Sequence, residues 1–449
     1  MVTSKLVEFI YKTKFEDLTP AAVKMARLAF LDWLGNAAAG SKQSPAQMVL
    51  GVIEELGGHP EATLLAGGGR RSSSVNAALL NGVMSHIVEL DDVHRTSIIH
   101  PAAAVIPAAL AAAEKEHAGG RDLITAIVVG YEVAIRVAEA ITPSHYYFWH
   151  TTGTCGTFGA AAAAAKILRL GTDAVTWALG SAGTQAAGLW EFMADGGSMS
   201  KHLHPGKAAM NGLLSALLAR RGFTGASRIL EGKRGFCRAT ATDINFDLIT
   251  GGLGGGSYKI EEISFKIHSS CRHTHPAVDV VLDLALRHEI GPDDVQSIKV
   301  STYKTALDIT NNYMPDSLYA AKFSLPFCVA LALKERRCGP AEFNKAALTD
   351  PVIRSLMERT KLAVDPALDA LHPRLWPVSV KITTRSGRVL EGYSDSTRGD
   401  PENPVPAEEL EQKFLTLAGG PWGKGNAARI MELCRDLDAV SDMAFVLLF

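Results

Sequence analysis

Residues 81–100, NGVMSHIVELDDVHRTSIIH, hold a dense group of ionisable side chains. The stretch begins as a helix with Val83, Ile87 and Leu90 on one face. It then carries three acids and two histidines, which are Glu89, Asp91, Asp92, His94 and His100. Acids and imidazoles gathered at one helix exit are typical of sites that bind and transfer protons. The alternative is a solvated helix end, in which the acids are merely polar and His94 lies on the surface.

A second candidate group lies in FWHTTGTCGTFG, where His150 stands just before a helix whose start is rich in Gly and Thr. The N–H groups and hydroxyls of such a start can hold an anion, and His150 is placed to act as an acid or base beside it. The spacing of a nucleotide phosphate loop is absent. The alternative is that the glycines serve close helix packing and that His150 is a hydrogen-bonded loop residue.

The segment MSKHLHPGK at residues 199–207 places Lys201, His202, His204 and Lys207 ahead of an Ala-rich helix. Two lysines and two imidazoles beside a helix N-terminus suit carboxylates, because the charges and the helix dipole act in the same sense. A zinc site is the rival interpretation. His-x-His can ligate a metal, but the third ligand would have to come from elsewhere in the chain.

A second basic segment, FKIHSSCRHTHPAVD at residues 265–279, contains Lys266, Cys271 and Arg272. Arginine presents a planar group that matches a carboxylate, so Arg272 is the best single candidate for a substrate clamp. Cys271 is open as a nucleophile, although a cysteine followed by arginine is more often a packed thiol. The alternative for the whole segment is a basic helix entrance tied to acids such as Asp279.

Composition excludes several classes of function. The chain has 449 residues, of which 47% are hydrophobic and 20% charged, and this balance predicts a folded protein of two or three domains. A net charge of −2 gives no overall basic field, so nucleic acid and membrane are not expected as partners. The six cysteines lie far apart without a metal-binding spacing, and the N-terminus lacks the pattern of a secretory signal. We therefore expect reduced thiols and a cytoplasmic protein.

Apolar periodicity predicts helices almost throughout residues 3–250. Thr19 and Pro20 open one of them as N-cap and first-turn proline. The expected helices are 21–39, 73–90, 101–117, 122–141, 157–168, 173–189 and 207–220. After GGLGGGS, strands are expected at 297–303, 378–384 and 389–393, the last two as a hairpin, and helices at 274–288, 318–334 and 351–362. The tail from Pro406 is helical again. We predict a mainly α fold, with an all-helical domain over 1–255 completed by 400–449 and an α+β domain over 256–399.

The polar segments would form one positively lined cleft if they converge. Such a cleft fits a substrate that carries two or three carboxylates. Lysine and arginine hold the carboxylates and stabilise the enediolate-like charge that develops when a proton beside a carboxylate is removed. A histidine or a carboxylate takes that proton, and another histidine protonates the leaving group or the opposite face. Loss of water, loss of carbon dioxide and inversion all remain open on the residues alone.

At this point the chain resembles the MmgE/PrpD family, which includes 2-methylcitrate dehydratase, cis-aconitate decarboxylase and iminodisuccinate epimerase. The resemblance covers nearly the whole chain. It rests on LDWLGNAAAGS (31–41), NGVMSHIVELDDVH (81–94) with His100-Pro101, WHTTGTCGTFGAAAAAAK (149–166), MSKHLHPGKAAMNG (199–212), FKIHSSCRHTHPAVD (265–279) and AAKFSLPF (320–327). It implies a large all-helical domain joined by the chain ends, a smaller α+β domain, a homodimer, and a metal-free site between the domains.

The resemblance also implies site positions. Matched motif by motif, the family's functional positions fall on Glu89, Asp91, Asp92, His100, His150, Lys201 and Lys266. The decarboxylase branch has histidine, tyrosine, aspartate and threonine in place of Cys271, Phe327, Glu89 and Val93. These four departures weigh against decarboxylation, and the Cys271-Arg272 pair looks more like the bacterial dehydratase-type members.

We therefore predict a cofactor-independent hydro-lyase acting on a small tricarboxylate or related hydroxy acid, with 2-methylcitrate-type dehydration as the leading case. The predicted catalytic residues are Asp91, His100, His150, Lys201 and Lys266, with no metal. The predicted substrate-binding residues are Glu89, Asp92, His204, Cys271 and Arg272. The alternatives are an epimerase of an iminodisuccinate-like dicarboxylate, a cis-aconitate-type decarboxylase, and a non-catalytic helical binding protein.

Overall fold

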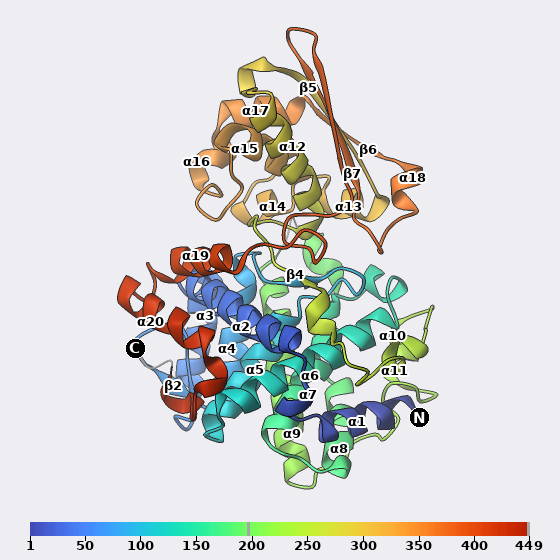
Figure 1. Ribbon diagram of the computed structural model, residues 1–449, viewed down its shortest axis with the longest axis vertical. Coiled ribbons are helices and arrows are strands. Elements are labelled where there is room, and N and C mark those ends of the chain that lie inside the picture. The colour runs from blue at the N-terminus through green and yellow to red at the C-terminus, as the bar shows by residue number, and fades with distance from the viewer. Residues whose placement is uncertain (195–197, 447–449) are drawn as a thin grey trace.

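The computed structural model describes residues 1–194 and 198–446, and it divides the chain into a wide lower domain and a narrower upper one (Figure 1). The lower domain is helical and contains both ends of the chain, whereas the upper domain combines helices with a sheet. The fold is therefore mainly α, with a large helical domain and a smaller α+β domain, as the sequence predicts.

The lower domain is built from the helices α1 (Val2–Lys12), α2 (Pro20–Ser41), α3 (Ser44–Leu56), α4 (Ser74–Ile87), α5 (Pro101–Lys115), α6 (Gly120–Glu139), α7 (Thr151–Ile167), α8 (Thr172–Gly183), α9 (Ser200–Arg220), α10 (Phe236–Thr240), α11 (Asp247–Thr250), α19 (Ala407–Ala418) and α20 (Lys424–Arg435). The loops between these helices contain two short pairs of antiparallel strands. They are β1 (Ala62–Thr63) with β2 (Arg71–Ser72), and β3 (Val93–His94) with β4 (Ile263–Ser264). The tail helix α19 packs on α2, so these residues return to the helical domain.

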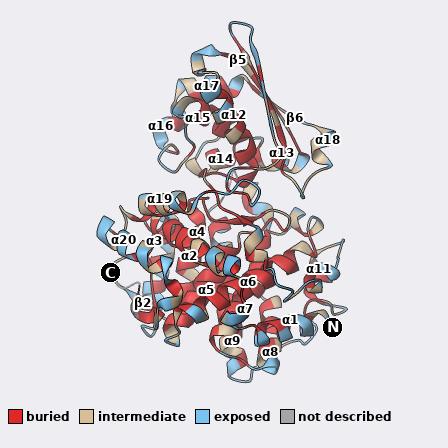
Figure 2. Ribbon diagram, viewed as in Figure 1, coloured by how far each residue is buried: buried red, intermediate tan, exposed pale blue. Residues whose placement is uncertain are grey.

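Small side chains bring the central helices close together. Alanines 160–165 of α7 are essentially inaccessible to solvent. A Cβ atom added to Gly82 of α4 would lie 2.8 Å from the Cα atom of Gly206 in α9, so these two helices touch at paired glycines. The result is a densely packed interior, which appears in Figure 2 as continuous buried ribbon through the lower domain.

Helix starts agree with the sequence where a cap defines them. The hydroxyl of Thr19 accepts the N–H of Ala22 at 2.9 Å, and Pro20 occupies the first turn of α2. Two other starts were predicted wrongly. Helix α7 begins at Thr151, so the Gly/Thr-rich segment forms its first turns, and α9 begins at Ser200 and continues through Pro205. A proline usually marks a helix start, but here the contact of the neighbouring glycine with α4 holds the helical path.

The upper domain has a four-stranded sheet in the order β6-β5-β7-β8. Its strands are β5 (Val295–Thr302), β6 (Thr360–Val364), β7 (Val378–Thr384) and β8 (Val389–Ser394). β5 pairs in parallel with β6 and antiparallel with β7, and β7 and β8 form the predicted hairpin. The helices are α12 (His275–Arg287), α13 (Lys304–Thr310), α14 (Leu318–Lys322), α15 (Leu325–Glu335), α16 (Lys345–Thr349), α17 (Pro351–Glu358) and α18 (Pro366–Asp369).

Two expectations for the upper domain were wrong. The predicted helix 351–362 ends at Glu358, and the residues after it form β6, because β5 offers a parallel partner for their backbone. The predicted helix 318–334 is interrupted at Ser324, whose hydroxyl accepts the N–H of Phe327 at 3.1 Å and caps α15. A serine followed two residues later by Pro326 is a local helix start that outweighs the apolar periodicity.

Each domain has its own apolar core. The core of the lower domain takes residues up to Phe265 and again from Val405, whereas the core of the upper domain spans Ala277 to Leu390. The chain therefore crosses between the domains in residues 266–274, before α12, and 395–404, after β8. In the described part of the chain, no helix is both long and apolar enough to cross a membrane.

Candidate active site

The carboxylate of Glu89 lies at the centre of a buried charged cluster between the domains. The ammonium of Lys201 forms an ion pair with Glu89 Oε1. The ammonium of Lys266 donates to the backbone oxygen of Glu89 at 3.1 Å and lies 3.5 Å from Oε2. Glu89 comes from the end of α4, Lys201 from the first turn of α9 and Lys266 from the first crossing segment. Three segments that are distant in the sequence thus meet at one point, which is the condition that a shared anion-binding cleft requires.

Glu89 has an unusual backbone and a strongly stabilised charge. Its φ of 57° lies in the left-handed region, which a residue with a side chain rarely adopts and which is concentrated at functional sites. Burial would raise the pKa of the Glu89 carboxyl. The positive charges of Lys201 and Lys266 outweigh burial and hold that pKa well below its ordinary value. Glu89 is therefore ionised and neutralises part of the lysine charge.

Asp91 is bound to a histidine that the sequence did not single out. Oδ2 of Asp91 lies 2.6 Å from Nδ1 of His86, and both side chains are fully buried. Burial would raise the pKa of Asp91, but His86 and His100 lower it well below its ordinary value, so the carboxylate is ionised. Nε2 of His86 has no hydrogen-bond partner among the described residues. A carboxylate that holds one imidazole nitrogen and leaves the other free is a common acid–base arrangement.

Both side-chain oxygens of Asp92 are hydrogen-bonded to residues of the helical domain. Its Oδ2 accepts the hydroxyl hydrogen of Tyr131 at 2.8 Å, and its Oδ1 accepts the N–H of Ala102 at 3.1 Å. Burial raises the pKa of Asp92 to about 8, so this carboxyl is mostly protonated at neutral pH. Because both oxygens serve the fold at the start of α5, we propose a positioning role for Asp92 in place of the predicted contact with substrate.

The histidines around the two lysines are neutral. Nδ1 of His100 donates to the backbone oxygen of Asp92 at 2.7 Å, and Nδ1 of His150 lies 3.2 Å from Nδ1 of His204. Burial lowers the pKa of His100 to about 3 and that of His204 to about 4, and it holds the pKa of His150 well below its ordinary value. A neutral imidazole can accept a proton, so each of these residues has the charge state of a base.

The imidazoles also lie close to one another. The ring centre of His86 is 5.2 Å from that of His100 and 5.6 Å from that of His150. The His100 side chain is 13% exposed, whereas the side chains of His86 and Asp91 are completely buried. The three imidazoles therefore form one group, and His100 is more accessible than the side chains of His86 and Asp91.

The structure adds Lys322 and Tyr319 to the cluster. The ammonium of Lys322 donates to the backbone oxygen of Val88 at 3.0 Å, and burial lowers its pKa to about 8 against the opposing pull of Glu89. The Tyr319 hydroxyl is buried without a hydrogen-bond partner in the described chain, and its ring centre lies 5.1 Å from that of His202. The sequence signal for Lys322 was present, because it is the one charged residue of AAKFSLPF.

Cys271 was considered as a nucleophile and Arg272 as a substrate clamp, and the structure shows the surroundings of both side chains. Burial raises the pKa of the Cys271 thiol to about 11, so the thiol is protonated at neutral pH and is a poor nucleophile. The guanidinium of Arg272 forms a buried ion pair with Asp400 from the second crossing segment. Nη1 of Arg272 has no partner among the residues described. Arg272 thus joins the two crossing segments and keeps one N–H group for a ligand.

The zinc interpretation of His-x-His does not fit the helix. Because residues two apart on a helix point in different directions, His202 and His204 have different neighbours. The ring of His202 packs on Tyr319, whereas that of His204 packs on Phe192 and His150. The two imidazoles therefore do not offer ligands to one ion.

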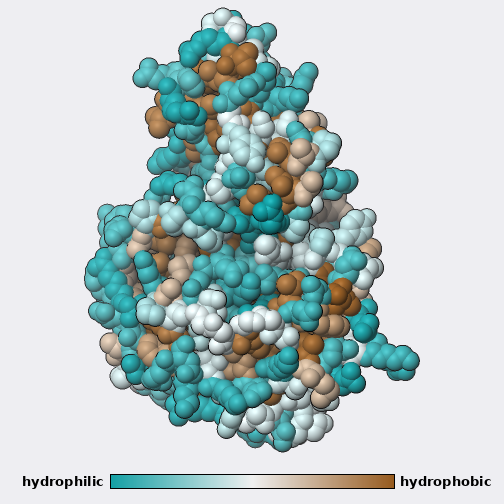
Figure 3. Space-filling model, turned by 45° about the vertical axis from the view of Figure 1, so that its right-hand side comes forward, coloured by the Kyte–Doolittle hydropathy of each residue, from teal (hydrophilic) through white to brown (hydrophobic). Residues whose placement is uncertain are grey.

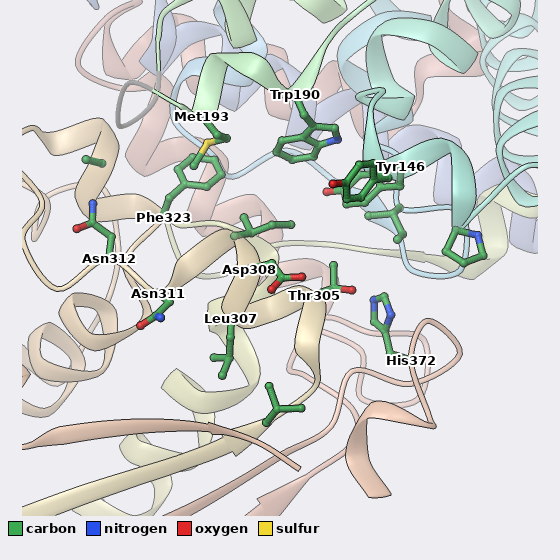
Figure 4. A pocket seen from close by; sticks show the side chains of 16 residues that line it. Tyr146, Trp190, Met193, Thr305, Leu307, Asp308, Asn311, Asn312, Phe323 and His372 are labelled. Atoms are coloured by element: carbon green, nitrogen blue, oxygen red, sulfur yellow. The ribbon is translucent and has the colours of Figure 1, made fainter. Parts of the chain in front are cut away.

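A pocket with a volume of about 820 Å³ adjoins the cluster (Figure 4). Its lining comes from both domains, with Trp190 on the lower one and Thr305 on the upper one. The molecule narrows between these domains (Figure 3). Trp190, at the start of a short helical turn (Trp190–Met193), lines the pocket, and its ring centre is 5.6 Å from that of His150. Phe323 lines it from the upper domain, and the ammonium of Lys201 is 4.7 Å from the centre of its ring. The pocket therefore gives a small molecule a place beside the charged cluster.

Known proteins resemble the chain over nearly its whole length. Residues 4–249 match the model of the MmgE/PrpD N-terminal domain, and residues 268–439 match that of the MmgE/PrpD C-terminal domain. Cis-aconitate decarboxylase from Aspergillus terreus is 26% identical over an alignment 470 residues long, which covers 99% of this chain and 94% of that protein. The human cis-aconitate decarboxylase is 24% identical, with 98% and 92% covered. The mitochondrial 2-methylcitrate dehydratase of Yarrowia lipolytica is 23% identical, with 96% and 86% covered.

Proposed function

The chain belongs to the MmgE/PrpD family, and we propose that it is a cofactor-independent lyase that dehydrates a 2-methylcitrate-like hydroxy acid. The observation that carries the proposal is the convergence of the Lys201 and Lys266 ammonium groups on Glu89, inside a cluster of neutral imidazoles. The relatives named above are decarboxylases and a dehydratase, and both kinds of enzyme are lyases. The proposed reaction is one member of that class.

The charge of the cluster supports a substrate with several carboxylates. The lysines at 201, 266 and 322 face two ionised carboxylates, Glu89 and Asp91, while the nearby imidazoles of His100 and His150 are neutral. An excess of positive charge in a buried place attracts an anion strongly, because little water screens it. In the complex a substrate carboxylate shares the ammonium groups that Glu89 now neutralises.

The chemical step needs one base and one acid. His150 takes the proton from the carbon beside a substrate carboxylate, and Lys201 and Lys266 stabilise the negative charge that this leaves on the carboxylate. The carbon–oxygen bond then breaks, the carbon–carbon double bond forms, and His86 gives its proton to the departing hydroxyl, which leaves as water. Asp91 stabilises the protonated form of His86 that this step requires. We assign His100, the most accessible of these imidazoles, to hydrogen bonding with the substrate.

Decarboxylation is the second candidate, because cis-aconitate decarboxylases from fungi and mammals are among the relatives. Against it, Cys271 is a protonated thiol and not an imidazole, so it is a weak source of the proton that replaces carbon dioxide. Phe327 is buried in the upper domain's core and carries no hydroxyl. We therefore rank dehydration first.

Incubation of the purified protein with 2-methylcitrate, citrate and cis-aconitate tests the proposal. We expect ultraviolet absorbance from an unsaturated product with 2-methylcitrate, no release of carbon dioxide, and no activity in Lys201→Ala. Carbon dioxide from cis-aconitate would establish the decarboxylase instead. Uptake of solvent deuterium by an imino or amino dicarboxylate, without loss of water or carbon dioxide, would indicate the epimerase. Silence with every substrate would overturn the assignment to a small polycarboxylate.

A further inference from the structure

The lysines of the charged cluster lie beside one side of the pocket between the domains. The pocket's lining residues Trp190 and Phe323 contact His150 and Lys201 of the cluster, but in the part of the chain that the structure describes no lysine or arginine lines the pocket wall. The carboxylate of Asp308 lies on that wall and is already paired with Lys304 at 2.6 Å. Burial lowers the pKa of His372 to about 4, so this wall residue is neutral at pH 7. A carboxylate placed in the pocket would therefore find no cation on that wall.

Aromatic rings line the pocket beside the cluster. The ring centres of Tyr146 and Trp190 are 4.9 Å apart, and Trp190 packs in turn against His150. Phe323 approaches from the other domain and faces the ammonium of Lys201. Tyr146, Trp190 and Phe323 line the pocket on the side where it contacts the cluster (Figure 4). An apolar group that leaves the charged cluster would thus pass directly onto aromatic surface.

The pocket offers room for a group larger than the small acids considered above. Ligand pockets of roughly 300–1,000 Å³ hold drug-sized molecules, and this one measures about 820 Å³. A small tricarboxylate bound at Lys201 and Lys266 would leave most of that volume to water. An attached hydrocarbon chain would occupy part of it and remove the partly exposed rings of Tyr146 and Trp190 from solvent.

We propose that the natural substrate is a polycarboxylate with an apolar substituent several carbons long, and that this substituent lies in the pocket beyond Trp190. The inference rests on the proposed function, because it takes the carboxylates to be held at Lys201 and Lys266. The indole N–H of Trp190 is buried and has no partner among the described residues. It is available to a hydroxyl or carbonyl group on the substituent, which would add selectivity beyond chain length.

Calorimetric titration of the whole protein with 2-methyl-, 2-butyl- and 2-hexylcitrate tests this inference by affinity, whether or not the compounds react. We expect affinity to rise by about fourfold for each added methylene that the pocket buries. Turnover of the same compounds is followed separately. Equal affinities together with turnover of 2-methylcitrate would overturn the inference and leave the proposed function standing. Rising affinity without turnover would support the inference and overturn the proposed function. No binding of any of the compounds would overturn both the inference and the proposed function.

A pair of matched variants locates the effect. Thr305 lines the pocket, so Thr305→Trp fills part of it at a distance from the lysines. Thr349 is exposed elsewhere in the same domain, and Thr349→Trp is the control for the size of the new side chain. We expect Thr305→Trp to abolish the dependence of affinity on chain length while 2-methylcitrate binds as before, and Thr349→Trp to change neither. A chain-length dependence that survives in Thr305→Trp would place the substituent elsewhere and overturn the inference.

Discussion

Oδ2 of Asp91 and Nδ1 of His86 are 2.6 Å apart, and neither side chain is accessible to solvent. Nδ1 donates this hydrogen bond to the carboxylate, so Nε2 is the nitrogen that can exchange a proton with a ligand. The negative charge of Asp91 also stabilises the protonated imidazole. Asp91 therefore acts on the substrate through His86, which makes it a positioning residue by geometry.

The variant Asp91→Asn tests this relationship. An asparagine can donate to Nδ1 and would move the imidazole proton to Nε2, and it no longer stabilises the charged form. We expect kcat to fall by about 10²–10⁴-fold, as when a general acid or its orienting carboxylate is removed, with little change in KM. Steady-state kinetics on the reactive substrate measure this split. Asp316→Asn, at an exposed position, is the control. A change in KM alone would mean that Asp91 contacts the substrate directly.

The Lys201–Glu89 pair makes a second prediction, on stability. Lys201→Met leaves the Glu89 carboxylate buried with one fewer partner, so we expect the free energy of unfolding to fall by about 3 kcal/mol, the low end for breaking a buried pair, since Lys266 remains. The double variant Lys201→Met/Glu89→Gln removes the unpaired charge and should recover part of the loss. Urea unfolding followed by fluorescence measures both. A double variant less stable than the single one would contradict the assignment of an ionised Glu89.

The sequence was informative wherever the signal is local. Thr19 with Pro20 marks the start of α2, and the alternation of Val378, Val380 and Ile382 marks a strand, because these patterns follow from the geometry of one element. The cluster was also predictable in part, since Glu89, Lys201 and Lys266 are charges that interrupt apolar surroundings. Burying such charges is costly unless they meet, and in the structure they do.

What the sequence could not supply is set by contacts between distant segments. His86 lies on the buried side of α4 and looks like an ordinary core residue until Asp91 is seen beside it. Trp190 belongs to a short turn without periodicity, and its role depends on the approach of the other domain at Phe323. The strand β6 depends on β5 as a partner some sixty residues away in the chain. None of these contacts can be inferred from the residue pattern of one segment alone.

The protonated state of Asp92 makes a prediction on pH. Its pKa is raised from 3.8 to about 8 by burial, so between these values the folded state binds one proton more than the unfolded state. Stability from this group is fully present below pH 3.8 and is lost as the pH rises through 8, at no more than about 1.4 kcal/mol per pH unit. Asp92→Asn has no carboxyl at this position, so the loss of stability that Asp92 causes with rising pH is absent from this variant.

Urea unfolding at pH 6.5 and pH 8.0 therefore separates the wild-type protein from Asp92→Asn. We expect the wild-type protein to lose more stability than the variant between these two values. Glu114, whose pKa is raised to about 7, and Lys322, whose pKa is lowered to about 8, titrate in both proteins, so the difference reports on Asp92. Equal losses in the two proteins would mean that Asp92 is already ionised in the folded state.

The contact between Gly82 and Gly206 links helix packing to the geometry of the charged cluster. Glu89 follows α4 and Lys201 begins α9, so the distance between these helices helps to set the distance between their charges. A Cβ atom added to Gly206 would lie 2.5 Å from the backbone oxygen of Leu79, which cannot move without α4. We expect Gly206→Ala to cost about 1–3 kcal/mol of stability through overpacking and to lower kcat/KM as the helices separate.

Gly51→Ala is the matched control for this last prediction, because Gly51 also lies in a helix, α3, but an added Cβ atom there meets nothing within 4 Å. With no clash, the loss of backbone freedom in the unfolded chain should stabilise the protein by about 0.5–1 kcal/mol and leave catalysis unchanged. The two variants make the same chemical change in the same kind of element. If Gly206→Ala also left kcat/KM unchanged, the distance between α4 and α9 would not control the alignment of Glu89 with Lys201, and the cluster would be held by the crossing segments alone.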